Sequence, residues 1–131
     1  MSLAADLFTA LSGSAGITAV VGARIYPKVM PEATPLPGPT LVYKDLDSTL
    51  TLTHSGPSGL REAHFQFDVY ATTEEDADAG ADAVNAFLST FSGTVGGTAF
   101  QGAVHIREAG SYERETRLFR ALVEWGIWYT G

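Results

Sequence analysis

A pair of carboxylates directly follows the first apolar strand signal of the sequence. Residues 45–49 read D-x-D-x-T, the spacing at which phosphoaspartate phosphatases place a nucleophilic carboxylate and a second one that handles the proton of the leaving group. Such sites also need a downstream lysine and further carboxylates for magnesium, and both lysines, Lys28 and Lys44, lie upstream of Asp45. We therefore interpret Asp45 and Asp47 as part of a strand-end loop whose side chains bond to their own backbone, with a small Mg²⁺-dependent phosphatase as an alternative.

A second candidate site lies on one face of the clearest strand pattern. His64, Gln66 and Asp68 alternate within residues 60–71, so their side chains share one side of a strand, where a metal ion is conceivable. His54 and His105 are further imidazoles that such a site would draw on. Neither a helical H-x-x-x-H pair nor a carboxylate cluster supports it, and the alternation is typical of the solvent-facing side of a strand. The sequence therefore predicts neither a bound metal nor a cofactor.

Most arginines gather near the C-terminus, and glutamates stand between them. The interleaved negative charges cancel the field that a nucleic-acid site needs. Because the planar guanidinium suits carboxylates at interfaces, the cluster is more consistent with ion pairs between subunits. The arginines are Arg107, Arg114, Arg117 and Arg120, and the glutamates are Glu108, Glu113, Glu115 and Glu124.

The composition is that of one globular domain, residues 1–131. The chain is 45% hydrophobic and 18% charged, with 8 basic and 15 acidic side chains and a formal net charge of −7. This balance excludes a protein whose affinity comes from neutralising phosphates, and the lack of cysteine excludes thiol catalysis and disulfides. No apolar run reaches the ~20 residues that cross a bilayer, so no membrane partner is predicted. The N-terminus lacks a basic signal-peptide start, so we expect synthesis in the cytosol.

The elements that must position these residues follow from periodicity and turn signals. We expect helices over residues 2–11, 15–21 and 73 to about 91, the last capped by Thr73. Strands are predicted at 40–46, 60–71, 99–108 and 116–129, with a short extended piece at 24–26 and turns at 93–97 and 110–115. Residues 27–39 hold five of the six prolines and predict a stiff connector, whereas residues 47–59 predict two weakly paired strands or a mobile arm.

This order of elements predicts an α+β fold. We expect a mostly antiparallel sheet of four to five strands, with one long helix and short N-terminal helices packed on one face. In residues 60–71, the side chains expected in the core are those of Ala63, Phe65, Phe67, Val69 and Ala71. The opposite sheet face carries charges and aromatic rings, a mixture that suits burial against another copy of the chain.

Several segments together resemble the tail completion (tail terminator) proteins of long-tailed bacteriophages and of related prophage or gene-transfer-type elements. The matching segments span nearly the whole chain in the same order: residues 24–27, 35–43, 56–61, 65–71, 72–93, 101–102 and 112–116, and the final strand with its tryptophans. Each segment alone is unspecific, and their order carries the resemblance.

The resemblance implies a structural virion protein and not an enzyme. It implies a small α+β subunit of a ring, expected to be a homohexamer, that caps the finished tail tube and offers a joining surface for the head. The implied partners are further copies of the chain, the tail tube protein and the head-completion or connector protein, with DNA passing through an acidic lumen. The implied place is the head-proximal end of the tail, after assembly in the host cytoplasm. Another ring-forming neck or tail-tube subunit is the alternative.

The candidate interfaces are one acidic segment, one polar loop and one segment with arginines. The acidic start of the long helix and the polar loop after residue 46 are expected to be exposed, one of them reaching a ring neighbour or the tube. The candidate residues are Asp47, Leu50, Leu52 and His54 in the loop, Glu74, Glu75 and Asp76 in the helix, and Arg114, Arg117 and Arg120 near the C-terminus.

Overall fold

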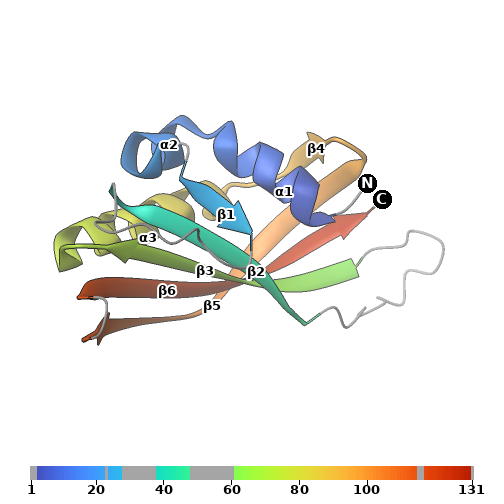
Figure 1. Ribbon diagram of the computed structural model, residues 1–131. Coiled ribbons are helices and arrows are strands. Elements are labelled where there is room, and N and C mark those ends of the chain that lie inside the picture. Colours follow the sequence, from blue (N-terminus) through green and yellow to red (C-terminus); the bar gives the residue numbers. More distant parts are fainter. Residues whose placement is uncertain (1–2, 23, 28–37, 48–60, 115–116, 131) are drawn as a thin grey trace.

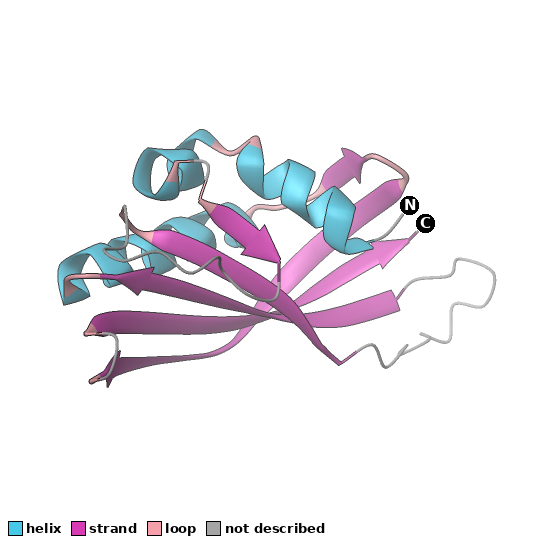
Figure 2. Cartoon of the chain, in the orientation of Figure 1, coloured by secondary structure: helices cyan, strands magenta, loops and turns pink. Residues whose placement is uncertain are grey.

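The computed structural model describes residues 3–22, 24–27, 38–47, 61–114 and 117–130, with the backbone alone for Ala4, Asp47 and Arg61 (Figure 1). Within this part of the chain, three helices cover one face of a six-stranded sheet: α1 (Leu3–Ser12), α2 (Ala15–Val21) and α3 (Glu74–Ser89) (Figure 2). None of these helices is long and apolar enough to cross a membrane. The α+β prediction is confirmed.

The sheet has the strand order β1-β2-β3-β6-β5-β4. The first pair, β1 with β2, is parallel, and the other pairs are antiparallel. The strands are β1 (Ile25–Pro27), β2 (Thr40–Asp47), β3 (Arg61–Ala71), β4 (Gly93–Val95), β5 (Thr98–Glu113) and β6 (Leu118–Thr130).

Three details of the predicted fold do not match the structure exactly. The prediction of four to five strands missed β4, because a three-residue strand is too short to show alternation. The sheet is mostly antiparallel, as predicted, but the β1–β2 pair is parallel. The helices also do not divide into one long and two short ones, since α1 has 10 residues against 16 in α3.

The β5–β6 hairpin is longer than its sequence suggested. The turn predicted at 110–115 lies mostly inside β5, where Gly110 pairs with Ala121 and Tyr112 pairs with Phe119. The rings of Tyr112 and Phe119 lie 4.7 Å apart, so aromatic contact across the strands extends the ladder past the small residues that resemble a turn. The joined ends of the hairpin thus lie at the end of the sheet where α3 begins (Figure 1).

The core lies between the helices and the inner face of the sheet. The apolar side of the alternation predicted for β3 is confirmed, since all five of its expected core side chains are buried. On its polar side, Gln66 and Asp68 are buried and do not face solvent as expected. Helix α3 lies close to this face at Gly80, where a Cβ would overlap the side chain of Val69. Trp125 of β6 also donates its indole N–H to Asn85 Oδ1 of α3 at 2.9 Å. These contacts fix how α3 lies over β3 and β6.

Caps and one buried carboxylate secure the helices. Thr73 caps α3 as predicted, its hydroxyl accepting the Asp76 N–H at 3.2 Å, although the helix ends at Ser89 and not near 91. In α1, buried Asp6 accepts the hydroxyl hydrogen of Thr98 at 2.5 Å. This bond ties α1 to the start of β5.

Candidate interaction surfaces

The outer face of the sheet holds a buried polar cluster, Gln66–Asp68–Arg120. Asp68 Oδ1 accepts from Arg120 Nε at 3.0 Å, and Asp68 Oδ2 accepts from the Gln66 amide at 2.8 Å. Asp68 is only 2% exposed and Gln66 only 6%. Because Asp68 lies between Val42 of β2 and Leu122 of β6, apolar neighbours in adjacent strands shield its carboxylate. The cluster is satisfied within the chain.

The contact with Asp68 raises the pKa of Arg120. Burial alone lowers the pKa of Arg120, but the hydrogen bond and the negative charge of Asp68 outweigh it, so the net pKa lies above the ordinary value. The Arg120 guanidinium also lies 5.9 Å from the centre of the Tyr70 ring. Burial raises the pKa of Tyr70, and although Arg120 opposes this shift, the phenol stays neutral at physiological pH.

The structure does not bring the proposed metal ligands together. His64 lies 3.5 Å from Glu62, and both oxygens of Asp68 are occupied by Gln66 and Arg120. His105 lies elsewhere, 3.0 Å from Glu108. In the part of the chain that the structure describes, no three His, Asp or Glu side chains are grouped to hold a metal.

The two aspartates of the D-x-D-x-T run belong to β2 and not to a loop. Asp45 pairs with Phe65, Asp47 pairs with His64, and a register shift separates the two aspartates. The strand thus extends one residue beyond the predicted end at 46, and the interpretation of these residues as a strand-end loop was wrong in that respect. The remaining loop candidates, Leu50, Leu52 and His54, lie outside the described residues, as does the arm or strand pair expected there.

The C-terminal arginines divide into two kinds. Arg107 Nε donates to Glu124 Oε1 at 3.0 Å, and Arg120 is held by Asp68, so both form ion pairs inside the chain. Arg114 and Arg117 are exposed where β5 and β6 are joined, and among the described residues neither has a carboxylate partner. We call Arg114 and Arg117 the hairpin tip. Their role in contacts between subunits stays a prediction.

The predicted acidic start of α3 is exposed and extends further along the helix. Glu74, Glu75 and Asp76 occupy the first turn, and Asp78 and Asp82 follow. Glu74, Asp78 and Asp82 recur every four residues, which places them on one side of the helix. We call these three residues the α3 flank. Sequence reasoning missed Asp78 and Asp82, although this spacing was available to find them.

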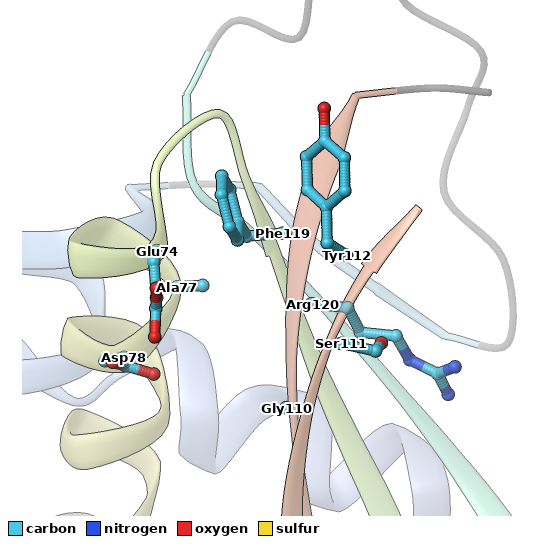
Figure 3. Close-up of a pocket in the computed structure, with 8 residues that line it drawn as sticks. All are labelled: Glu74, Ala77, Asp78, Gly110, Ser111, Tyr112, Phe119 and Arg120. Atoms are coloured by element: carbon cyan, nitrogen blue, oxygen red, sulfur yellow. The ribbon is translucent and has the colours of Figure 1, made fainter. Parts of the chain in front are cut away.

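A shallow hollow separates α3 from the hairpin. It measures about 290 Å³, and in Figure 3 Glu74 and Asp78 lie on the side of α3 that faces the strands. The ring of Phe119 lies between α3 and Tyr112, whereas the Arg120 guanidinium points away from the helix. A second hollow continues past Asp82 along β5 and β6. The α3 flank therefore forms an acidic wall along an open groove.

The far side of β5 forms a free edge. Strand β4 pairs with β5 only over residues 98–100, and from there to Glu113 the described residues offer β5 no partner but β6. Exposed apolar side chains occur on this part of the strand: Val104 is 48% exposed, Ile106 41% and Tyr112 49%. The sequence did not predict this edge, because it placed the end of the strand at residue 108.

Comparison with known proteins identifies the family. The model of the family described as tail completion protein gp17 matches residues 5–130. The chain belongs to this family. The resemblance to bacteriophage tail completion proteins is thus confirmed. The chain is a structural tail protein of the virion.

Solved structures share the fold. A chain in the virion of a native gene transfer agent particle has a TM-score of 0.78 and 20% sequence identity, covering 99% of this chain and 96% of that one. Among curated protein sequences, none is significantly similar to this chain.

Proposed function

We propose that the chain is one subunit of a ring, a homohexamer, that closes the head-proximal end of a phage tail tube. The ring ends tube elongation and presents the surface to which the head joins. The observation that carries this proposal is the match to the tail completion family over residues 5–130, supported by the gene transfer agent fold that covers almost the entire chain. The partners are then further copies of the chain, the tail tube protein and a head-completion or connector protein.

In this proposal the mechanism is assembly geometry, without bond-making chemistry. A closed ring repeats the same contact around its axis, so patches that are individually weak add up to a stable assembly. The net charge of −7 supports the passage of DNA through such a ring, because an acidic lumen repels the phosphates of DNA and does not bind them.

Electron microscopy of purified tail tubes incubated with the protein tests the proposal. We expect one ring-shaped cap at a single end of each tube. Incorporation along the tube identifies a tube subunit instead, and binding only to the head vertex identifies a neck subunit. Either outcome overturns the capping role.

The phosphatase alternative has its own test. The Asp45→Asn variant and the unmodified chain are assayed with Mg²⁺ and a phosphate monoester. We expect no turnover from either protein. Turnover that disappears in Asp45→Asn overturns the structural role.

A further inference from the structure

The later part of β5 is a strand with an uncovered edge. Strand β4 pairs with β5 only as far as Phe100, whereas the opposite side of the sheet ends in the three residues of β1 with Pro27, which has no N–H to donate. Short strands and prolines are the devices with which proteins blunt sheet edges, and β5 has neither after Phe100. Every residue from Val104 to Tyr112 is exposed. In the part of the chain that the structure describes, this edge is therefore open to an added strand.

The usable part of this edge is regular. The last register shift lies between His105 and Arg107, and from Arg107 to Glu113 the ladder with β6 runs without interruption. We call residues 107–113 the β5 edge. In such a strand, the backbone N–H and C=O groups of alternate residues point away from the one neighbouring strand. An extended segment can thus bond to the β5 edge along its whole length.

Helix α3 follows the β5 edge at a matching spacing. The first hollow joins Glu74 and Asp78 to residues 110–112, and the second joins Asp78 and Asp82 to residues 108–110 (Figure 3). Successive members of the α3 flank are about 6 Å apart along the helix axis. Alternate residues of an extended segment are about 6.7 Å apart. Three alternate side chains of a docked segment therefore meet the three carboxylates in turn.

The groove between α3 and the β5 edge is acidic. Glu108 adds a carboxylate to the three of the α3 flank. Among the described residues, the one arginine that lines the two hollows is Arg120, and its guanidinium is bonded to Asp68 and points away from the helix (Figure 3). His105 lies 3.0 Å from Glu108 and, when protonated, neutralises that carboxylate alone. The groove thus favours a segment whose side chains toward α3 are basic.

The chain itself contains no segment with this pattern. Its 8 basic residues nowhere stand two apart in the sequence, so no strand of a second copy presents basic side chains at neighbouring positions of one face. The hairpin tip is no exception, because glutamates alternate with its arginines. The segment that fits the groove therefore belongs to a different protein.

We propose that the β5 edge receives an extended segment of a different protein, which adds as a further strand and places three alternate basic side chains against Glu74, Asp78 and Asp82. Main-chain hydrogen bonds supply the affinity of such an added strand, and the α3 flank selects the alternation of charge. The contact goes beyond the proposed ring, because its partner is not another copy of the chain.

A synthetic peptide tests the charge pattern. The probe is a fluorescently labelled, end-capped peptide of sequence T-K-T-K-T-K-T, and its matched control, T-T-K-K-K-T-T, has the same composition without the alternation. Fluorescence anisotropy with the unmodified chain gives the Kd of each. We expect the control to bind at least about tenfold more weakly than the probe. Equal Kd values, or no measurable binding of the probe, overturn the proposal.

Two variants test which carboxylates face the segment. Asp78→Asn removes the central carboxylate of the α3 flank and is expected to raise the Kd of the probe by about fivefold. Glu75→Gln is the matched control, because Glu75 is exposed on the same helix, lines neither hollow beside β5, and removes the same charge. We expect it to change the Kd by less than about twofold. Equal changes in the two variants overturn docking along the α3 flank.

Backbone methylation of the probe tests the added strand. In an extended peptide the N–H groups of the lysines point to one side and those of the threonines to the other. One probe is methylated at the lysine nitrogens and another at the threonine nitrogens, so only one of them is blocked from bonding to β5. We expect that probe to bind at least about tenfold more weakly and the other to stay within about threefold. The same result in both probes overturns the added strand.

These results are separate from those that test the ring. The probe stands for a partner other than a further copy, so its failure to bind leaves the proposed function standing. A chain that does not cap tail tubes in electron microscopy, yet binds the probe with the expected pattern, overturns the proposed function and supports this contact.

Discussion

Two polar regions of this molecule look alike in sequence and differ in what they do. In the Gln66–Asp68–Arg120 cluster, each charge has a partner within the chain, and apolar neighbours exclude water. In the α3 flank and the hairpin tip, the charges are exposed and, as far as the structure describes the chain, carry no ion pair with each other. The comparison teaches that an arginine can form an ion pair with another molecule only where the fold has not already paired it with a carboxylate of the same chain.

The largest expected effect on stability comes from a substitution in the buried Gln66–Asp68–Arg120 cluster. Asp68→Ala leaves Arg120 half-buried without its counter-charge and is expected to lower the free energy of unfolding by about 3 kcal/mol. Chemical denaturation measures this loss. Asp78→Ala removes an exposed carboxylate instead and is expected to change stability by less than about 0.5 kcal/mol. Equal losses in the two variants would contradict the division.

The second prediction tests how α3, and with it the α3 flank, is seated on the sheet. Gly80→Ala places a methyl group against buried Val69 and is expected to cost about 2 kcal/mol of stability. In Gly126→Ala the new methyl group meets first the end of the flexible Glu62 side chain, 2.7 Å away, which can move aside. We expect the second loss to be less than half of the first, and an equal loss would show that α3 is not held closely at Gly80.

The third prediction uses the pKa of Tyr70. Burial raises this pKa above its ordinary value of 10.0, so the folded protein holds the phenol proton more tightly than the unfolded chain does. The stabilisation is complete below pH 10 and is lost as the pH rises from there through the pKa of the folded state. Denaturation at pH 9 and at pH 11 is expected to show a smaller alkaline loss in Tyr70→Phe than in the unmodified chain. An unchanged loss would mean that Tyr70 is not the group concerned.

The smallest expected effect on stability comes from substitutions of the exposed arginines at the hairpin tip. Arg114→Glu combined with Arg117→Glu is expected to leave the free energy of unfolding within about 0.5 kcal/mol, because both side chains are exposed. The same variant is expected to lose ring formation in light scattering. A stability loss of several kcal/mol would show that Arg114 and Arg117 make stabilising contacts within the folded chain.

Local patterns in the sequence predicted the parts of the fold that local forces determine. The apolar side of the β3 alternation and the Thr73 cap of α3 both follow from neighbouring residues, and both were confirmed. Strand β4 and the second half of β5 depend on pairing with other segments, and the small residues around Gly110 resembled a turn when taken alone. Only the partner strand shows that they continue the ladder.

The same distinction explains what could be predicted about the interaction surfaces. The exposure of Glu74 follows from its place in the first turn of the helix and was expected. The ion pair of Arg120 within the chain was not expected, because its partner Asp68 lies 52 residues away in the sequence. The free edge of β5 was not foreseen either, because the sequence placed the end of this strand at residue 108 and did not show how little of it β4 covers.

The most direct test of the central claim is the growth of tail tubes in the presence of this chain. Tube protein is allowed to polymerise while the chain is added in amounts rising to one ring per tube, and tube lengths are measured by electron microscopy. The account predicts that growth stops once each tube has received one ring, and that the chain is found only at tube ends. Tubes that grow to the same length whatever amount is added, or that contain the chain throughout, would contradict it.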